Sequence, residues 1–114
     1  MTTKNIVYRQ GDVLIVRLAD DATRPETDDK VTTENIILAY GEVTGHAHRL
    51  SYSPGKARIK AFKTPTLVND RLMTLDEVAK LLHEEHGEIT LPAGDYIVRQ
   101  QREYSPMNDR LVQD

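Results

Sequence analysis

The feature that most constrains the fold is a succession of short runs rich in β-branched and aliphatic residues, separated by turn-forming residues. The clearest runs are residues 12–18, 35–43, 57–62 and 95–104. Val and Ile favour the extended backbone of a strand, and runs of this length suit single strands. Five or six such strands predict a mainly β chain, folded over residues 1–114 as a single small antiparallel β-barrel or sandwich.

Two segments that contain proline and glycine predict turns between these strands. In "SPGK", residues 53–56, proline stands second and glycine third, which is the chemistry of a type II turn. We expect this turn to join a strand through residues 46–52 to the strand at 57–62 as a hairpin. In "LPAG", residues 91–94, proline stands second and glycine fourth, which suits a type I turn before the last strand. Residues 64–73 are a further candidate for extended structure.

Residues 74–87 fit two interpretations. Thr74 and Glu77 have the spacing of a helix capping box, and a glycine follows at the far end, which predicts one short helix over residues 74–85. The surrounding β pattern favours instead a strand that follows a tight turn at residues 76–77. The sequence leaves both interpretations open.

Composition and charge bound the functional classes. The formal net charge is −3, so bulk attraction to nucleic acid is not expected, and the acidic stretch at residues 20–34 is interpreted as a solvated loop. No apolar run approaches the roughly 20 residues needed to cross a bilayer, and the first residues lack the apolar core of a signal peptide. The absence of cysteine fits a reducing compartment. We therefore expect a cytoplasmic globular protein without nucleic-acid or membrane partners, and homo-oligomerisation stays open.

All four histidines lie in two short clusters, "GHAHRL" and "HEEHG". On a strand His46 and His48 would point to one face, and strict alternation would add Glu42 to that face. Two imidazoles with this spacing can reach one ion at about 2.0–2.1 Å. His83 and His86 would share a face on a helix but point apart on a strand.

These clusters predict a site for a divalent first-row transition metal. Without cysteine, its ligands must be imidazole and carboxylate, and such sites suit Zn, Fe, Ni or Cu without a choice among them. The alternative is that the imidazoles are unrelated, exposed or hydrogen-bonded side chains. The predicted ligands are His46, His48, at least one of His83 and His86, and a carboxylate from Glu42 or, alternatively, Glu84.

Two features resemble the cupin superfamily of small jelly-roll barrels that hold a metal inside: His46 and His48 on a strand, and the "GEITLPAG" turn at residues 87–94 before a late strand. The resemblance implies a cupin-like barrel with these two histidines as metal ligands. The chain departs from the cupin pattern at position 97, where Ile97 stands in place of a histidine. The blocks around both histidine clusters are also similar to a group of short, uncharacterised bacterial and phage proteins, which implies a shared domain without an assigned activity.

Two classes of function follow from these features. In the first, a metal with an open coordination position activates water or a small oxygen-bearing substrate, in the manner of a hydrolase or an oxygenase. Glu84 and Glu85, beside the histidines, are the candidate general bases. In the second, the chain is a non-catalytic accessory protein whose histidines close a structural site or help to bind a partner.

Overall fold

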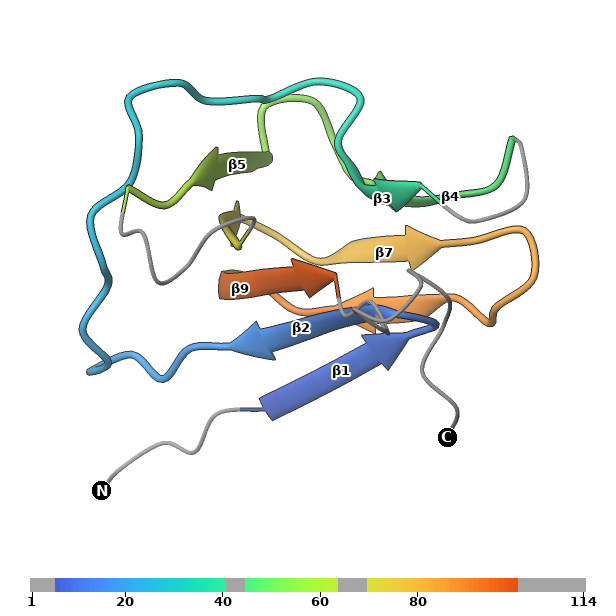
Figure 1. Cartoon of the computed structure of the whole chain (residues 1–114), viewed down its shortest axis with the longest axis horizontal. Coiled ribbons are helices and arrows are strands. Elements are labelled where there is room, and N and C mark those ends of the chain that lie inside the picture. Colours follow the sequence, from blue (N-terminus) through green and yellow to red (C-terminus); the bar gives the residue numbers. More distant parts are fainter. Residues whose placement is uncertain (1–5, 41–44, 64–69, 101–114) are drawn as a thin grey trace, which may run out of the picture.

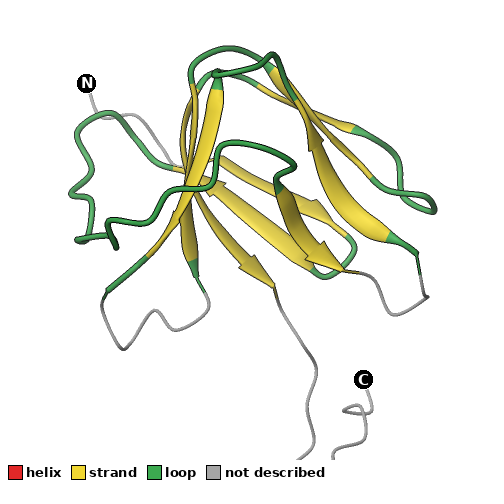
Figure 2. Cartoon of the chain, turned by 90° about the horizontal axis from the view of Figure 1, so that it is seen from above, coloured by secondary structure: helices red, strands yellow, loops and turns green. Residues whose placement is uncertain are grey.

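The structure is a computed structural model, which describes residues 6–40, 45–63 and 70–100. Its described residues form strands and loops, without a helix (Figures 1 and 2). The strands, in chain order, are β1 (Ile6–Gln10), β2 (Val13–Arg17), β3 (Ile37–Tyr40), β4 (Ala47–Ser51), β5 (Ala57–Ala61), β6 (Arg71–Leu75), β7 (Ala79–Leu82), β8 (Ile89–Leu91) and β9 (Gly94–Gln100).

The strands form two antiparallel sheets that pack face to face. One sheet has five strands in the order β1-β2-β9-β6-β5, and the other has four in the order β3-β4-β7-β8. Both sheets keep separate edges, so the molecule is a small β-sandwich (Figure 1). The expectation of a mainly antiparallel β fold is confirmed in its sandwich form, whereas the closed-barrel form is not what the chain adopts.

The core follows from the alternation of side chains along each strand. Each strand turns one set of residues towards the opposite sheet, and antiparallel pairing aligns these sets across neighbouring strands. Tyr96 shows this arrangement: it pairs with Met73 in the register, and both side chains are fully buried. The main members of the core are Val13, Ile15, Ile36, Leu38, Leu50, Ile59, Met73, Leu75, Leu81, Leu91, Tyr96 and Val98.

The strand predictions fall within this sandwich. β2, β3, β5 and β9 lie in the four runs expected to be strands, although residues 41–43 and 101–104 of those runs are outside the described residues. Residues 64–69 of the expected extended segment at 64–73 are likewise outside them, and its end belongs to β6. Two strands, β1 and β8, were not expected from the sequence.

The structure chooses the strand interpretation of residues 74–87, so the short helix predicted at 74–85 is wrong. Thr74 lies in β6, the chain turns after it, and β7 alternates buried and exposed side chains as a half-buried strand does. β6 pairs with β5 and β9, while β7 pairs with β4 and β8. Sheet pairing on both sides of each strand outweighs the local capping signal.

The predicted turn at residues 53–56 is present, but the predicted hairpin is wrong. Gly55 has a φ of 78°, and the Lys56 amide donates to the Ser53 carbonyl at 3.0 Å. A positive φ at the third position is what a type II turn requires, and glycine adopts it without steric cost. The strands on either side, β4 and β5, belong to different sheets. The turn therefore carries the chain from one layer of the sandwich to the other.

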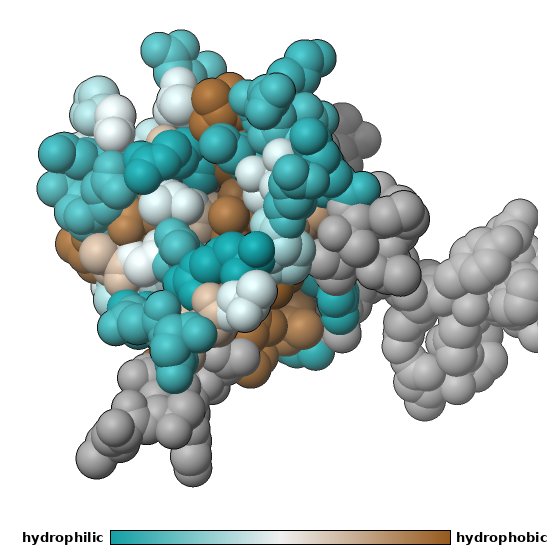
Figure 3. Space-filling model, turned by 90° about the vertical axis from the view of Figure 1, so that its left-hand side faces the viewer, coloured by the Kyte–Doolittle hydropathy of each residue, from teal (hydrophilic) through white to brown (hydrophobic). Residues whose placement is uncertain are grey.

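The acidic stretch at residues 20–34 lies along the outer edge of the five-stranded sheet. Thr27 forms a bridge with Phe62, and Thr32 forms one with Ile59 on the edge strand β5. Covering an edge in this way blocks pairing with another chain. Figure 3 views the end of the molecule opposite the β1–β2 turn, where hydrophilic residues separate small hydrophobic groups. Within residues 6–40, 45–63 and 70–100, no helix is long and apolar enough to span a membrane.

Two neighbouring leucines test the strand assignment of residues 79–82. Leu81 is 0 % exposed, whereas Leu82 is 37 % exposed. Leu81→Ala should therefore lower the free energy of unfolding by about 2–5 kcal/mol, because it leaves a cavity in the core. Leu82→Ala, the matched control, should cost less than about 1 kcal/mol. Urea denaturation of both variants measures the difference, and equal losses would contradict the alternation.

A candidate metal-binding site of four histidines

Three segments that are far apart in the sequence meet at one end of the sandwich. They are the β1–β2 turn at residues 11–12, the residues that lead into β4, and the β7–β8 turn at residues 83–88. β7 ends, and β4 begins, at the same end of their shared sheet because the two strands are antiparallel neighbours. In Figure 1 this end lies on the right, where the β7–β8 turn projects beyond the β1–β2 turn.

The histidine rings lie side by side in this region. The ring centroids of His48 and His83 are 4.3 Å apart, and those of His83 and His86 are 4.6 Å apart. His48 and His86 are stacked at 5.9 Å, and His46 meets the edge of His83 at 5.8 Å. The structure therefore brings both sequence clusters together.

The histidines do not meet through the alternation of side chains along a strand that the sequence suggested. His48 lies within β4 and is buried, whereas His46 precedes the strand and is half-buried. His83 and His86 lie in the turn after β7, where neither helical nor strand spacing applies, so a turn joins two rings that a strand would separate. Glu42, the fifth predicted ligand, lies outside the described residues.

His48 is held in one orientation by Gln10, the last residue of β1. The Gln10 amide nitrogen donates to the carbonyl oxygens of Leu81 at 3.0 Å and Gly87 at 2.9 Å. Its amide oxygen is therefore turned towards His48 Nδ1, 2.8 Å away. An amide oxygen can only accept, so Nδ1 carries a hydrogen and neutral His48 has its free lone pair on Nε2. Ligating histidines are commonly oriented by such a bond from their second nitrogen.

Asp12 faces the free nitrogen of His48. Asp12 Oδ1 lies 3.4 Å from His48 Nε2, and Asp12 Oδ2 accepts a hydrogen bond from Gln100 Nε2 at 2.9 Å. Burial lowers the pKa of His48 below its ordinary value; the adjacent His83 and His86 act in the same direction, and Asp12 opposes them. Neutral imidazole, the form that binds metals, is therefore favoured at His48.

The two predicted catalytic acids have different surroundings. Glu84 accepts hydrogen bonds from the Arg49 guanidinium and from the Ala47 amide, and these bonds lower its pKa to about 2. A carboxylate with so low a pKa is a weak base, which argues against Glu84 as a general base at neutral pH. Glu85 is more exposed and lies with Oε2 3.5 Å from His46 Nδ1, which itself has no hydrogen bond.

One group of side chains already has the proximity that a metal site needs. His46, His83 and Glu84 each offer a ligand atom, and these atoms lie within 4.8 Å of one another. His83 Nδ1 accepts a hydrogen bond from the Glu85 amide at 3.0 Å, so the neutral ring carries its hydrogen on Nε2. His83 would have to release that bond, or lose that hydrogen, before it could bind an ion. His48 needs no such change.

Gly11 allows the β1–β2 turn to approach the rings closely. Its φ is 58°, and a Cβ atom at this position would lie 2.8 Å from His86 Nε2 and 3.2 Å from His48 Cε1. Both the backbone conformation and the contact therefore require glycine. This requirement places the backbone of the turn directly against the histidine cluster.

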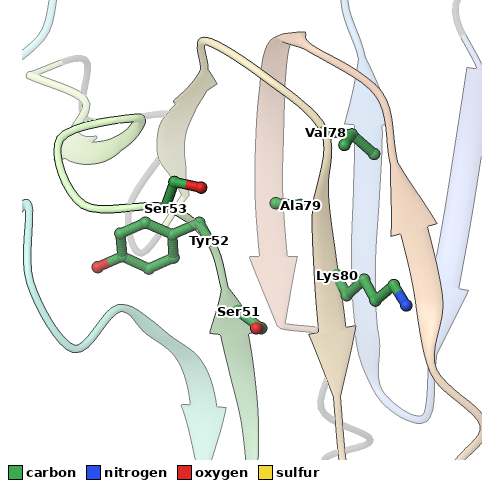
Figure 4. Close-up of a pocket in the computed structure, with 6 residues that line it drawn as sticks. All are labelled: Ser51, Tyr52, Ser53, Val78, Ala79 and Lys80. Atoms are coloured by element: carbon green, nitrogen blue, oxygen red, sulfur yellow. The ribbon is translucent and has the colours of Figure 1, made fainter.

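Two shallow pockets lie apart from the histidines. One is lined by residues 51–53 and 78–80 at the other end of β4 and β7, and in Figure 4 Tyr52 and Lys80 extend in opposite directions. The second is lined by residues 33–35 together with Tyr52, Pro54 and Gly55. Neither brings together the convergent polar groups that are typical of a ligand site.

Sequence reasoning missed three residues of the site: Gln10, Gly11 and Asp12. They stand next to one another in "RQGDV", immediately before a predicted strand. A Gly-Asp pair between two β-rich segments is a hairpin-turn signal, and recognising it would have placed β1 beside β2. Nothing in the sequence shows that this turn meets the histidines.

The fold and the site together describe a small antiparallel β-sandwich with an imidazole cluster at one end. Residues 9–101 match the family described as "Domain of unknown function (DUF8820)", and this match covers most of the chain. The chain belongs to that family. Neither the curated proteins nor the solved structures contain a match to the chain.

Substitution of Gly11 tests its contact with the histidines. Gly11→Ala should lower the free energy of unfolding by about 1–2 kcal/mol through the positive φ, and by more through its contact with His86. Gly55→Ala is the matched control, because its φ is also positive and nothing lies within 4 Å of its added Cβ. Nuclear magnetic resonance should show a shift of the His86 ring signals in Gly11→Ala alone. Unchanged His86 signals would contradict the contact.

The Glu84–Arg49 pair predicts a particular pH dependence. The pKa of Glu84 is lowered from 4.5 to about 2, so its pairing stabilises the folded state fully above pH 4.5. That contribution is lost as the pH falls from 4.5 through about 2. Unfolding free energies measured between pH 7 and pH 2 should therefore show wild type more stable than Glu84→Gln at high pH, with a gap that closes in acid. A gap that does not change with pH would refute the pairing.

Proposed function

We propose that this domain binds a divalent first-row transition metal ion at the histidine cluster. The observation that carries this proposal is the orientation of His48, whose Nδ1 is held by Gln10 while Nε2 is left free beside Asp12. His83 and His86 lie within ring contact of His48 and are its proposed partners, and His83 also has a ligand atom within 4.8 Å of those of His46 and Glu84. Zn, Fe, Ni and Cu all suit such ligands.

The environment of the cluster supports an ion with an open coordination position. One end of the cluster is closed, because the His48 side chain is 2 % exposed. The other end faces solvent, since the side chain of Glu85, beside His46, is 59 % exposed. An ion held from the closed end by protein ligands keeps a side on which water or a small oxygen-bearing molecule can bind.

A catalytic version of this function assigns the proton transfer to Glu85. Glu85 is exposed and close to His46, whereas Glu84 is engaged by Arg49. A metal ion lowers the pKa of bound water, and a carboxylate beside it can take the proton. Hydrolase-like and oxygenase-like reactions on a small molecule are the classes that fit.

The alternative is a non-catalytic accessory protein with a structural site. It is favoured by the link that Gln10 and His48 make between the two sheets, because a histidine in that position stabilises the fold without any ion. If an ion is bound in this version, a fourth protein ligand closes its coordination sphere; otherwise the histidines help to bind a partner. The likeness to cupins and a cytoplasmic location remain predictions; two facing antiparallel sheets support the first, and the absence of cysteine supports the second.

Metal titration of the metal-free 114-residue chain tests the proposal. Calorimetry with Zn²⁺, Ni²⁺ and Cu²⁺ should show about one ion bound per chain, and His83→Ala and His86→Ala should each weaken binding at least about 10-fold. Thr90→Ala, on the solvent side of β8, should bind as wild type does. A wild-type chain that binds none of the three ions would refute the function.

The coordination of the bound ion separates the two versions. Cobalt(II) in place of the native metal reports its ligands through its visible spectrum. Addition of azide should change that spectrum if a position is open, and should leave it unchanged if protein ligands close the site. A closed site would overturn the catalytic version and support the accessory one.

A further inference from the structure

The orientation of Gln10 determines which atom of His48 faces the β1–β2 turn. Because both hydrogens of the Gln10 amide are donated to backbone carbonyls, its oxygen accepts from His48 Nδ1. His48 Nε2 therefore directs a lone pair at the carboxylate of Asp12. Two acceptors that face each other repel, and only a cation between them makes the contact favourable.

The separation of the two atoms distinguishes between a proton and a metal ion. His48 Nε2 and Asp12 Oδ1 are 3.4 Å apart. A proton shared by a charged donor and acceptor draws them to about 2.7–2.9 Å, so this contact is long for an ionic hydrogen bond. Two ligand atoms that are each about 2.1 Å from an ion lie about 3.4 Å apart at the tetrahedral angle. The observed distance matches the edge of a metal coordination sphere.

The surroundings of the two atoms also match those of metal ligands. The His48 ring is buried, and the rings of His83 and His86 lie against it. Asp12 is in turn oriented by Gln100, which holds its second oxygen at 2.9 Å. Both halves of the pair are thus fixed by a neighbouring amide, as second-shell partners fix metal ligands.

We propose that Asp12 is a metal ligand, paired with His48 Nε2 on the same ion. This proposal rests on the proposed function and deepens it, because it adds a carboxylate that sequence patterns did not indicate. The carboxylate offsets part of the charge of a divalent cation beside the buried His48 ring, and Gly11 lets the turn come near enough to deliver it. A third ligand would come from the β7–β8 turn, where His83 or His86 would have to reorient, because the group of three ligand atoms within 4.8 Å of one another in the described residues includes neither His48 nor Asp12.

A pair of matched variants tests the role of Asp12. Asp12→Asn keeps the shape and a hydrogen bond to Gln100 but removes the charge, and should weaken Zn²⁺ binding in calorimetry at least about 10-fold. Asp76→Asn removes the same charge from an exposed ion pair with Arg58 in the β6–β7 turn, and should bind Zn²⁺ as wild type does. Circular dichroism of each variant checks that the fold is retained.

The outcomes separate this inference from the proposed function. If wild type binds Zn²⁺ and Asp12→Asn binds it equally well, Asp12 is not a ligand, although the metal site stands. If wild type does not bind, the proposed function itself fails. Should Asp12→Asn not fold, a crystal structure of wild type with Zn²⁺ decides: anomalous density within about 2.2 Å of an Asp12 oxygen supports the inference, and density beyond about 3 Å overturns it.

Discussion

The side chain of Gln10 joins the two sheets to the histidine cluster. It stands on the inner face of β1, yet all three of its bonds reach the opposite sheet or the turn that extends it: to the Leu81 carbonyl, the Gly87 carbonyl and the His48 ring. Gln10 is 2 % exposed, so an unmade bond would leave a buried polar group at a cost of about 1–3 kcal/mol. Sheet packing and histidine orientation therefore depend on one amide.

The histidine cluster has a buried, hydrogen-bonded interior and a solvent-exposed rim. At the interior, His48 is bound to Gln10 and lies against the β1–β2 turn, where Gly11 leaves just enough room for the rings. At the rim, Glu84 is held by Arg49 on the outer face of β4, and Glu85 stands further out in solvent. The proposed metal site would therefore have fixed side chains on one side and solvent access on the other, which is the arrangement that a reactive or exchangeable ion requires.

Much of the fold could be predicted from local sequence, and the predictions that were wrong have a common cause. Runs such as residues 12–18 and 57–62 contain strands because β-branched side chains suit a pleated, buried surface. Residues 74–85 carry a local helix signal that sheet pairing on both sides overrides. The turn at Gly55 was predicted correctly, yet turn chemistry fixes only a change of direction. Whether the next strand pairs with the previous one or joins the other sheet depends on distant strands.

The sequence by itself determined which side chains could bind a metal ion. Because the chain has no cysteine, these are the four histidines and the acidic residues near them, and the histidines lie in two short clusters. Only the tertiary structure decided that the clusters meet, that Gln10 fixes His48 and that Asp12 faces it. The bonds responsible join residues 38, 71 and 77 positions apart. Contacts of that range arise from the packing of one sheet on another, which no local propensity encodes.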